Sequence, residues 1–245
     1  MPSRSTVIAY LRRALVAVPA AGFALLAYSW ITLPDVRPLA TSNPTSTAFM
    51  DLRTEEALDK GQTPRRAQRW VAYSRISPDL KRAVLVAEDA AFWQHEGVDF
   101  KELQESLERD WAAGRLLRGG STITQQLAKN LYLSPSKNPL RKLREFLIAR
   151  RLEVELKKSR ILELYLNPIE WGDGIWGAEA AARTYFGMSA AYLGPTESAL
   201  LAGAIINPRV YSPARPNARL LRRQQLILRR MGAVTPPEST IQLER

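Results

Sequence analysis

Two short segments of this 245-residue chain bring together residue types that can transfer a proton next to a charged group. In the first, Glu88 and Asp89 stand near two aromatic residues and His95, the only histidine of the chain. In the second, glycines at 119 and 120 precede hydroxyl and amide side chains, and Lys129 follows. An acid followed by a donor-rich, cationic turn suggests chemistry on a neutral group beside a phosphate.

The first segment follows a predicted helix. Ser77 and Pro78 form a cap with proline at the first helical position, and apolar residues at helical spacing follow up to Glu88. The negative end of a helix dipole, with Asp89 adjacent, should raise the pKa of Glu88, which suits a general base. An ordinary helix-terminal acid is the simpler interpretation.

The neighbours of Glu88 have two interpretations each. His95 is expected to orient a neighbour or to satisfy the core rather than to react itself. Phe92 and Trp93 either belong to the core or shield the acids.

The second segment is expected to begin a helix, because Thr122 and Gln125 have the spacing of a capping box. Its first backbone N–H groups should be free, and such a helix terminus binds anions readily. The following predicted helix runs from 138 to about 157. On it Arg141 and Lys142 share a face with Glu145, and Ala149 leaves room beside that carboxylate.

Surface salt bridges are the usual role of such charged residues. The setting favours an anion site instead, because residues 129–145 surround one carboxylate with five cations, namely Lys129, Lys137, Arg141, Lys142 and Arg144.

Composition narrows the classes of partner and cofactor. The net charge of +11 and pI near 10.2 predict an anionic partner, which is nucleic acid, a lipid surface or a phosphorylated substrate. The absence of cysteine excludes disulfides and thiolate metal sites, and a single histidine disfavours zinc. The membrane segment described next favours the lipid and the phosphorylated substrate over nucleic acid.

Residues 14–33 contain no charged residue, and twenty residues are long enough for a helix that crosses a bilayer. Arg4, Arg12 and Arg13 precede this segment, so we expect residues 1–13 to be cytoplasmic and the rest to lie outside the membrane. A cleaved signal peptide is the alternative, but its apolar run would be shorter and residues 33–37 make a poor cleavage site.

The remaining chain is predicted to be mainly α. Residues 34–64 form a tether leading into a domain at 65–232, and a tail occupies 233–245. Helices are expected at 159–166, 178–185 and 195–205, followed by a basic helix, with a glycine-aromatic loop at 171–177. Leu103, Leu107 and Trp111 form one apolar stripe. We expect it to pack into the core; a membrane-facing surface is the alternative.

Five ordered motifs together resemble the peptidoglycan glycosyltransferase family, which comprises monofunctional transglycosylases and the N-terminal domains of class A penicillin-binding proteins. The patterns are E-D-x-x-F-x-x-H-x-G from Glu88, G-x-S-T-I-T-Q-Q-L-x-K-N-L up to Leu131, and R-K-x-x-E-x-x-x-A-x-x-L-E from Arg141. A fourth, K-x-x-I-L-E-x-Y-L-N, begins at Lys158, and Pro208 to Pro213 match the fifth. The resemblance covers roughly residues 46–217. Lys137 stands where relatives often have arginine, which keeps the charge but loses the planar fork.

The resemblance implies a lysozyme-like fold, with a helical head lobe and a smaller membrane-facing jaw lobe. It implies an enzyme of the bacterial inner membrane that polymerises lipid II into β-1,4-linked glycan and releases undecaprenyl pyrophosphate. The last motif lies close to the end of the chain, so we expect no transpeptidase domain. The expected partners are lipid II, the growing glycan chain and the membrane, together with other cell-wall or cell-division proteins, and not nucleic acid.

By the same resemblance, Glu88 and Glu145 are the catalytic acids. The substrate-binding residues would be Asp89, Phe92, His95, Ser121, Thr122, Gln125, Gln126, Lys129, Asn130, Lys137, Arg141, Lys142 and Arg144. No cofactor is required, although Mg²⁺ or Mn²⁺ at the pyrophosphate is compatible with the chemistry.

The residue types fit this reaction independently of the resemblance. A sugar hydroxyl needs a base, which Glu88 can supply, and a pyrophosphate leaving group needs charge neutralisation more than a proton. A glycosidase must instead protonate a poor leaving group. Two alternatives remain: a murein hydrolase on the same fold, which leaves the five cations unexplained, and a scaffold that has lost catalysis, which leaves both acids unexplained.

Overall fold

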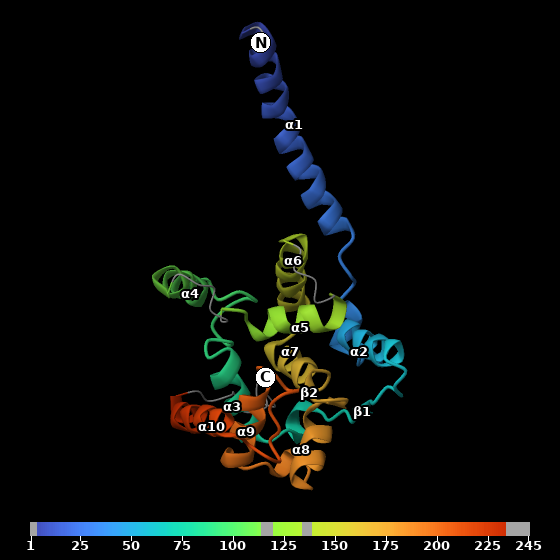
Figure 1. The fold of residues 1–245 in the computed structure, drawn as a ribbon, viewed down its shortest axis with the longest axis vertical. Coiled ribbons are helices and arrows are strands. Elements are labelled where there is room, and N and C mark those ends of the chain that lie inside the picture. The colour runs from blue at the N-terminus through green and yellow to red at the C-terminus, as the bar shows by residue number, and fades with distance from the viewer. Residues whose placement is uncertain (1–3, 114–119, 134–138, 234–245) are drawn as a thin grey trace, which may run out of the picture. The chain divides into compact units, whose positions relative to one another are not determined.

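The computed structural model describes residues 4–113, 120–133 and 139–233, and it is mainly helical (Figure 1). It forms two compact units, Met1–Asp35 and Val36–Arg245. The first contains helix α1 (Arg4–Ile31). Among the described residues, no helix is long and apolar enough to cross a membrane. The described residues do not include Lys137, Asn138 at the start of the helix predicted from 138, or the tail from 234.

The second unit is organised around two groups of helices. In one group α3 (Pro78–Glu88) and α10 (Ala218–Arg230) both pack on α9 (Pro195–Ala204). In the other, α5 (Ile123–Tyr132) packs on α6 (Pro139–Glu155), on α7 (Lys158–Leu166) and on α2 (Ala48–Asp59). Helices α4 (Phe100–Ala113) and α8 (Ala178–Phe186) complete the set, with short 3₁₀ turns at Arg37–Ala40, Tyr73–Arg75, Ala190–Tyr192 and Met231–Ala233.

The cap predicted for α3 is confirmed. The Ser77 hydroxyl accepts a hydrogen bond from the backbone N–H of Asp79 at 3.2 Å, and Pro78 occupies the first helical position. Leu80, Val84 and the residues between them that face α9 are buried, and the helix ends at Glu88. Burial of this apolar face therefore fixes where the Glu88 carboxylate leaves the helix.

A small sheet replaces the loop expected at 171–177. Strand β3 (Ile175–Trp176) lies between β1 (Ala67–Gln68), which is parallel to it, and β2 (Glu170–Gly172), which is antiparallel. Ala67 pairs with Ile175, and Glu170 pairs with Trp176. Strands of two or three residues leave almost no alternating pattern in the sequence, which is why the glycine-aromatic composition favoured a loop.

Two other expectations need correction. Residues 34–64 contain α2, whose N-cap Thr47 accepts a hydrogen bond from the N–H of Met50 at 3.1 Å. The α4 stripe does not pack into a core: Trp111 is 91% exposed and Leu107 is 58% exposed. Core packing of this stripe was therefore the wrong choice, and its apolar side chains face outward from the described part of the unit.

Candidate active site

Glu88 lines a cavity of about 300 Å³ at the end of α3. The cavity is also lined by Asp89, Ser121 and Thr122 from the two chemically rich segments, and by Asp99, Glu102 and Arg230. Burial raises the pKa of Glu88, against the opposing effects of a hydrogen bond from Gln126 and of the charges of Arg223 and Lys129. The predicted direction is confirmed, but burial is the main cause and Asp89 contributes less.

A chain of hydrogen bonds holds the Glu88 carboxylate. Gln126 donates from Nε2 to Glu88 Oε2 at 3.0 Å, and the Tyr165 hydroxyl donates to Gln126 Oε1 at 3.0 Å. Tyr165 lies on α7 and is fully buried, so its hydroxyl has a defined partner in a region without solvent. Because the tyrosine occupies the amide oxygen, the amide nitrogen is directed at the carboxylate.

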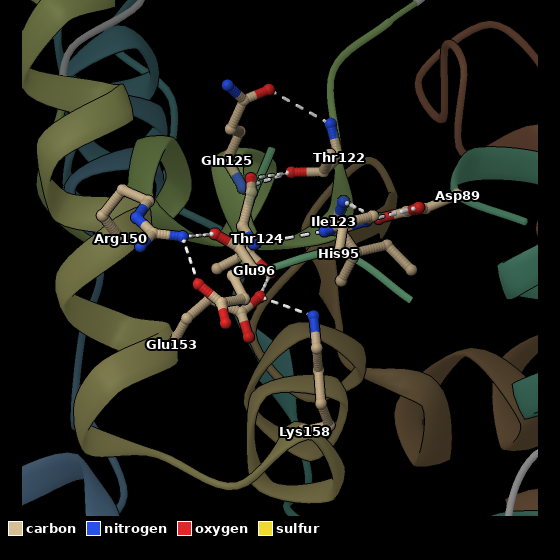
Figure 2. Close-up of polar contacts among 11 residues, drawn as sticks. Asp89, His95, Glu96, Thr122, Ile123, Thr124, Gln125, Arg150, Glu153 and Lys158 are labelled. Atoms are coloured by element: carbon tan, nitrogen blue, oxygen red, sulfur yellow. Dashed lines mark hydrogen bonds and ion pairs between the residues drawn. The ribbon is translucent and has the colours of Figure 1, made fainter. Parts of the chain in front are cut away.

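Asp89, the next residue, serves the framework of the site (Figure 2). Its Oδ2 accepts a hydrogen bond from the backbone N–H of Ile123 at 2.9 Å, and its Oδ1 lies 2.9 Å from His95 Nε2. The N–H of Gly97 donates to His95 Nδ1 at 3.1 Å, so Nδ1 carries no proton and Nε2 is the donor to Asp89. His95 therefore orients a neighbour, as its residue type suggested.

Protein side chains bind the backbone N–H groups of Thr122, Ile123 and Gln125 at the start of α5. Thr122 and Gln125 form the predicted capping box, with Thr122 Oγ1 accepting from the N–H of Gln125 and Gln125 Oε1 accepting from the N–H of Thr122, both at 3.2 Å. Together with the bond from Ile123 to Asp89, these contacts correct the expectation of free N–H groups. The helix terminus does attract an anion, but the anion is the carboxylate of Asp89.

A second network behind α5 fixes the same segment against α6 and α7 (Figure 2). Thr124 Oγ1 donates to Glu153 Oε1 at 2.6 Å, and Lys158 Nζ donates to the same oxygen at 2.8 Å. The Lys158 ammonium also lies 4.4 Å from the centre of the Phe92 ring, which is fully buried. Phe92 is therefore in the core of this region.

Glu145 is the most strongly paired acid of the site. It is only 3% exposed, and it accepts from Arg141 Nη1 at 2.8 Å and from the ammonium of Lys142. Both partners lie on the same face of α6, as the spacing predicted. Lys142 also lies 3.4 Å from the hydroxyl of Ser121, which lines the Glu88 cavity. This contact connects the Glu145 cluster with the cavity.

Lys129 couples the two acids electrostatically. Burial lowers the pKa of Lys129, attraction to Glu145 opposes this effect, and repulsion from Arg141 and Lys142 adds to it. Glu88 also attracts the ammonium, which lies 5.7 Å from the centre of the Phe49 ring of α2. A cation attracted by both carboxylates is well placed to bind an anion beside them.

Comparison with known proteins places this geometry in a family. A sequence model described as Transglycosylase matches residues 55–232. The chain belongs to the transglycosylase family. It is 48% identical to the biosynthetic peptidoglycan transglycosylase of Nitrosospira multiformis, with 80% of this chain and 85% of the relative covered. The protein of the same name from Dechloromonas aromatica is 49% identical, covering 80% and 84%, and that from Aromatoleum aromaticum is 53% identical, covering 69% and 74%.

The transglycosylase match includes every described residue that we assigned to the site. Asn130, which donates to the backbone oxygen of Gln126 at 2.8 Å, and the half-buried Arg144 complete the set. The contacts described for Phe92, His95 and Gln125 are internal, whereas Glu88, Asp89, Ser121 and Thr122 line the cavity and Lys142 contacts Ser121. Substrate binding by the whole set stays a prediction.

Three residues that support the transglycosylase site were not assigned to it from the sequence, although Glu153 and Tyr165 are fixed positions of the third and fourth motifs. Tyr165, Glu153 and Arg223 hold or influence the site from α7, α6 and α10. A signal was present for Tyr165, because a hydroxyl among buried leucines requires a polar partner. Arg223 was visible only as one charge of a basic helix.

Among the described residues, no group of three or more His, Asp or Glu side chains could hold a metal ion. Glu145 already accepts from two cations, so its oxygens are engaged.

Proposed function

We propose that this chain polymerises lipid II into β-1,4-linked glycan strands of peptidoglycan and releases undecaprenyl pyrophosphate. The observation that carries the proposal is the contrast between the two acids. Glu88 faces a cavity with one amide donor and a raised pKa, whereas Glu145 is paired with two cations of its own helix. The proposed base, Glu88, and the proposed anion site around Glu145 are thus connected through the contact between Lys142 and Ser121.

In the proposed reaction, Glu88 accepts the proton of the 4-hydroxyl of an N-acetylglucosamine. The hydroxyl oxygen forms a bond to C1 of an N-acetylmuramic acid, and the bond from C1 to the pyrophosphate oxygen breaks with inversion. A carboxylate with a raised pKa is a stronger base than an exposed one and remains ionised only above that pKa. No covalent intermediate is needed, because a single displacement by the hydroxyl inverts the configuration at C1 and the pyrophosphate departs in the same step.

The cations would stabilise the departing pyrophosphate. Lys129, Arg141 and Lys142 lie around Glu145, which keeps their side chains in place and limits their mutual repulsion. Arg144 and Lys137 belong to this proposal by their motif positions. Glu145 therefore acts here chiefly by positioning the cations. The proposed step is written without a divalent ion, and Mg²⁺ or Mn²⁺ at the pyrophosphate stays a prediction.

We also propose that residues 14–33 anchor the enzyme in the bacterial inner membrane, with the N-terminus cytoplasmic and the catalytic domain periplasmic. This part rests on the uncharged sequence and the three arginines before it. The exposed stripe of α4, with Phe100, Leu107 and Trp111 at its surface, would contact the lipid surface where lipid II resides.

The test is an assay of the purified full chain on two substrates. We expect it to convert lipid II into glycan strands and to leave lipid-free murein uncut. Cleavage of the murein would favour the hydrolase alternative, and failure to act on either substrate would favour the scaffold.

A further inference from the structure

A second cavity, of about 660 Å³, lies where α2 meets the turn between β2 and β3. It shares no lining residue with the Glu88 cavity. We call it the α2 pocket; it is lined by Arg53, Glu56, Ala57, Lys60, Gln62, Thr63, Arg65, Glu170, Asp173, Gly174 and Arg209. None of these residues was assigned a role in the glycosyl transfer.

The wall of the α2 pocket is a network of ion pairs. Arg53 contacts Glu170 through Nε at 3.1 Å and Glu56 through Nη1 at 2.8 Å. Arg209 contacts Glu56 at 3.4 Å and Asp173 at 3.3 Å. The two arginines are therefore held by the acids of the wall and are largely neutralised by them.

Glu170 leaves one strong acceptor in this wall. The residue is 8% exposed, and its Oε1 is buried without a hydrogen-bond partner among the described residues, while its Oε2 is bound to Arg53. A buried acceptor without a partner is costly, by about 1–3 kcal/mol, so such an atom commonly has a ligand or water to satisfy it. Burial raises the pKa of Glu170 and Arg53 opposes this effect, so a ligand group with an N–H or O–H donor at Oε1 would favour the ionised carboxylate.

The rim of the pocket has the opposite character. The side chains of Lys60 and Arg65 are exposed and make no ion pair or hydrogen bond within the described part of the chain, and the Lys60 charge acts on Glu56 only at longer range. Gly174 allows the rim to close: a Cβ there would come within 2.5 Å of the Arg65 Cβ and 2.9 Å of its carbonyl oxygen, and the backbone φ is +70°. The rim therefore suits an anionic group, above a buried carboxylate that suits a donor.

Helix α2 connects this pocket with the active site. Phe49, in its first turn, contacts Lys129, and Arg53 follows one turn later. At 1.5 Å per residue, the lining residues of α2 begin at Arg53, about 6 Å along the helix axis from Phe49, and extend to Ala57, at about 12 Å. A substrate bound at Lys129 could therefore extend into the pocket.

We infer that the α2 pocket binds the peptide part of the peptidoglycan substrate, with an amine or amide N–H at Glu170 and a carboxylate at Lys60 and Arg65. This inference rests on the proposed function. A peptide carries both kinds of group, whereas an unsubstituted sugar supplies donors for Glu170 but no anion for the rim. Pyrophosphate supplies the anion but no donor.

Binding can be tested without turnover. Amide hydrogen exchange of the full chain in detergent would be followed with a soluble muramyl peptide and, separately, with the same sugar carrying a simple amide on its lactyl carboxyl group in place of the peptide. We expect the muramyl peptide alone to protect residues 53–63 and 170–174, and the double variant Lys60→Ala/Arg65→Ala to lose this protection. Equal protection by the sugar amide, or no protection of these segments at saturating muramyl peptide, would overturn the inference.

Kinetics give a second test on lipid-linked disaccharides with and without the peptide. The rim double variant and Glu170→Gln should each raise KM for the peptide-bearing substrate about tenfold, the effect of one charged contact, and leave the peptide-free substrate unchanged. Glu55→Gln, on an exposed position of α2 outside the pocket, is the matched control. Equal losses on both substrates would refute peptide binding, whereas an inactive wild type with intact protection would refute only the proposed function.

Discussion

Gln126→Met removes the only hydrogen bond from a side chain to Glu88 among the described residues, while keeping a side chain of similar length. The bond lowers the pKa of Glu88 against the effect of burial, so its loss should raise that pKa further. A base with a higher pKa loses its activity at a higher pH, which moves the acidic limb of the pH-rate profile upward. A hydrogen bond to an ionised group contributes about 1.5–3 kcal/mol, so kcat/KM on that limb should fall roughly 10- to 100-fold.

The assay is initial-rate glycan synthesis from lipid II across the pH range, with kcat/KM at each pH. At the alkaline plateau the variant should stay within a few-fold of the wild type, because Glu88 is then ionised in both proteins. Tyr165→Phe should move the limb in the same direction by less, since it only releases the amide oxygen of Gln126. Gln94→Met, at an exposed position, is the control. An equal loss at every pH would show that Gln126 does not act through the protonation of Glu88.

Four further perturbations test other parts of the site and of the anchor. Glu88→Gln should reduce polymerisation by about 10²–10⁴. Because burial raises the pKa of Glu88, the stabilisation that this carboxyl group contributes is complete below its unfolded-state pKa and is lost as pH rises through its folded-state pKa. The Glu88→Gln variant should therefore melt no lower than the wild type at pH 8. A lower melting temperature would contradict this. Lys129→Ala and Arg141→Ala should each cost about 1–3 kcal/mol in the use of lipid II, measured as kcat/KM, and unchanged kinetics would remove the pyrophosphate role. Asp89→Asn should destabilise the start of α5 by about 1–3 kcal/mol, seen as faster hydrogen exchange at residues 123–126, and unaltered exchange would refute the framework role. Protease added to spheroplasts should cleave the domain after Pro34, and a protected domain would reverse the proposed orientation.

Local patterns in the sequence predicted the parts of the site that one helix contains. The cap at Ser77, the capping box at Thr122 and the pairing of Arg141 and Lys142 with Glu145 all depend on residues two to four positions apart. Helical geometry alone fixes such contacts. The same reasoning placed Glu88 at the end of its helix.

Contacts between distant segments were beyond the reach of these patterns. The bond from Ile123 to Asp89 spans 34 positions, and the bond from Tyr165 to Gln126 spans 39. Spacing could not show that Asp89 would occupy the helix terminus that was expected to be free. The exposure of Trp111 was equally hidden, because an apolar stripe indicates that a face is buried but not whether protein or lipid covers it.

The two adjacent acids at the end of α3 show how one local sequence can support two different tasks. Asp89 accepts hydrogen bonds from a backbone N–H and from a histidine N–H, which engage both oxygens of its carboxylate. Glu88 faces the cavity, receives a single amide donor and is penalised by burial when charged. Since desolvation strengthens a carboxylate base and the oxygens of Asp89 are already engaged within the protein, the residue suited to proton transfer is Glu88. Asp89 instead keeps α5 in place, and with it the Gln126 amide that sets how strongly Glu88 binds a proton.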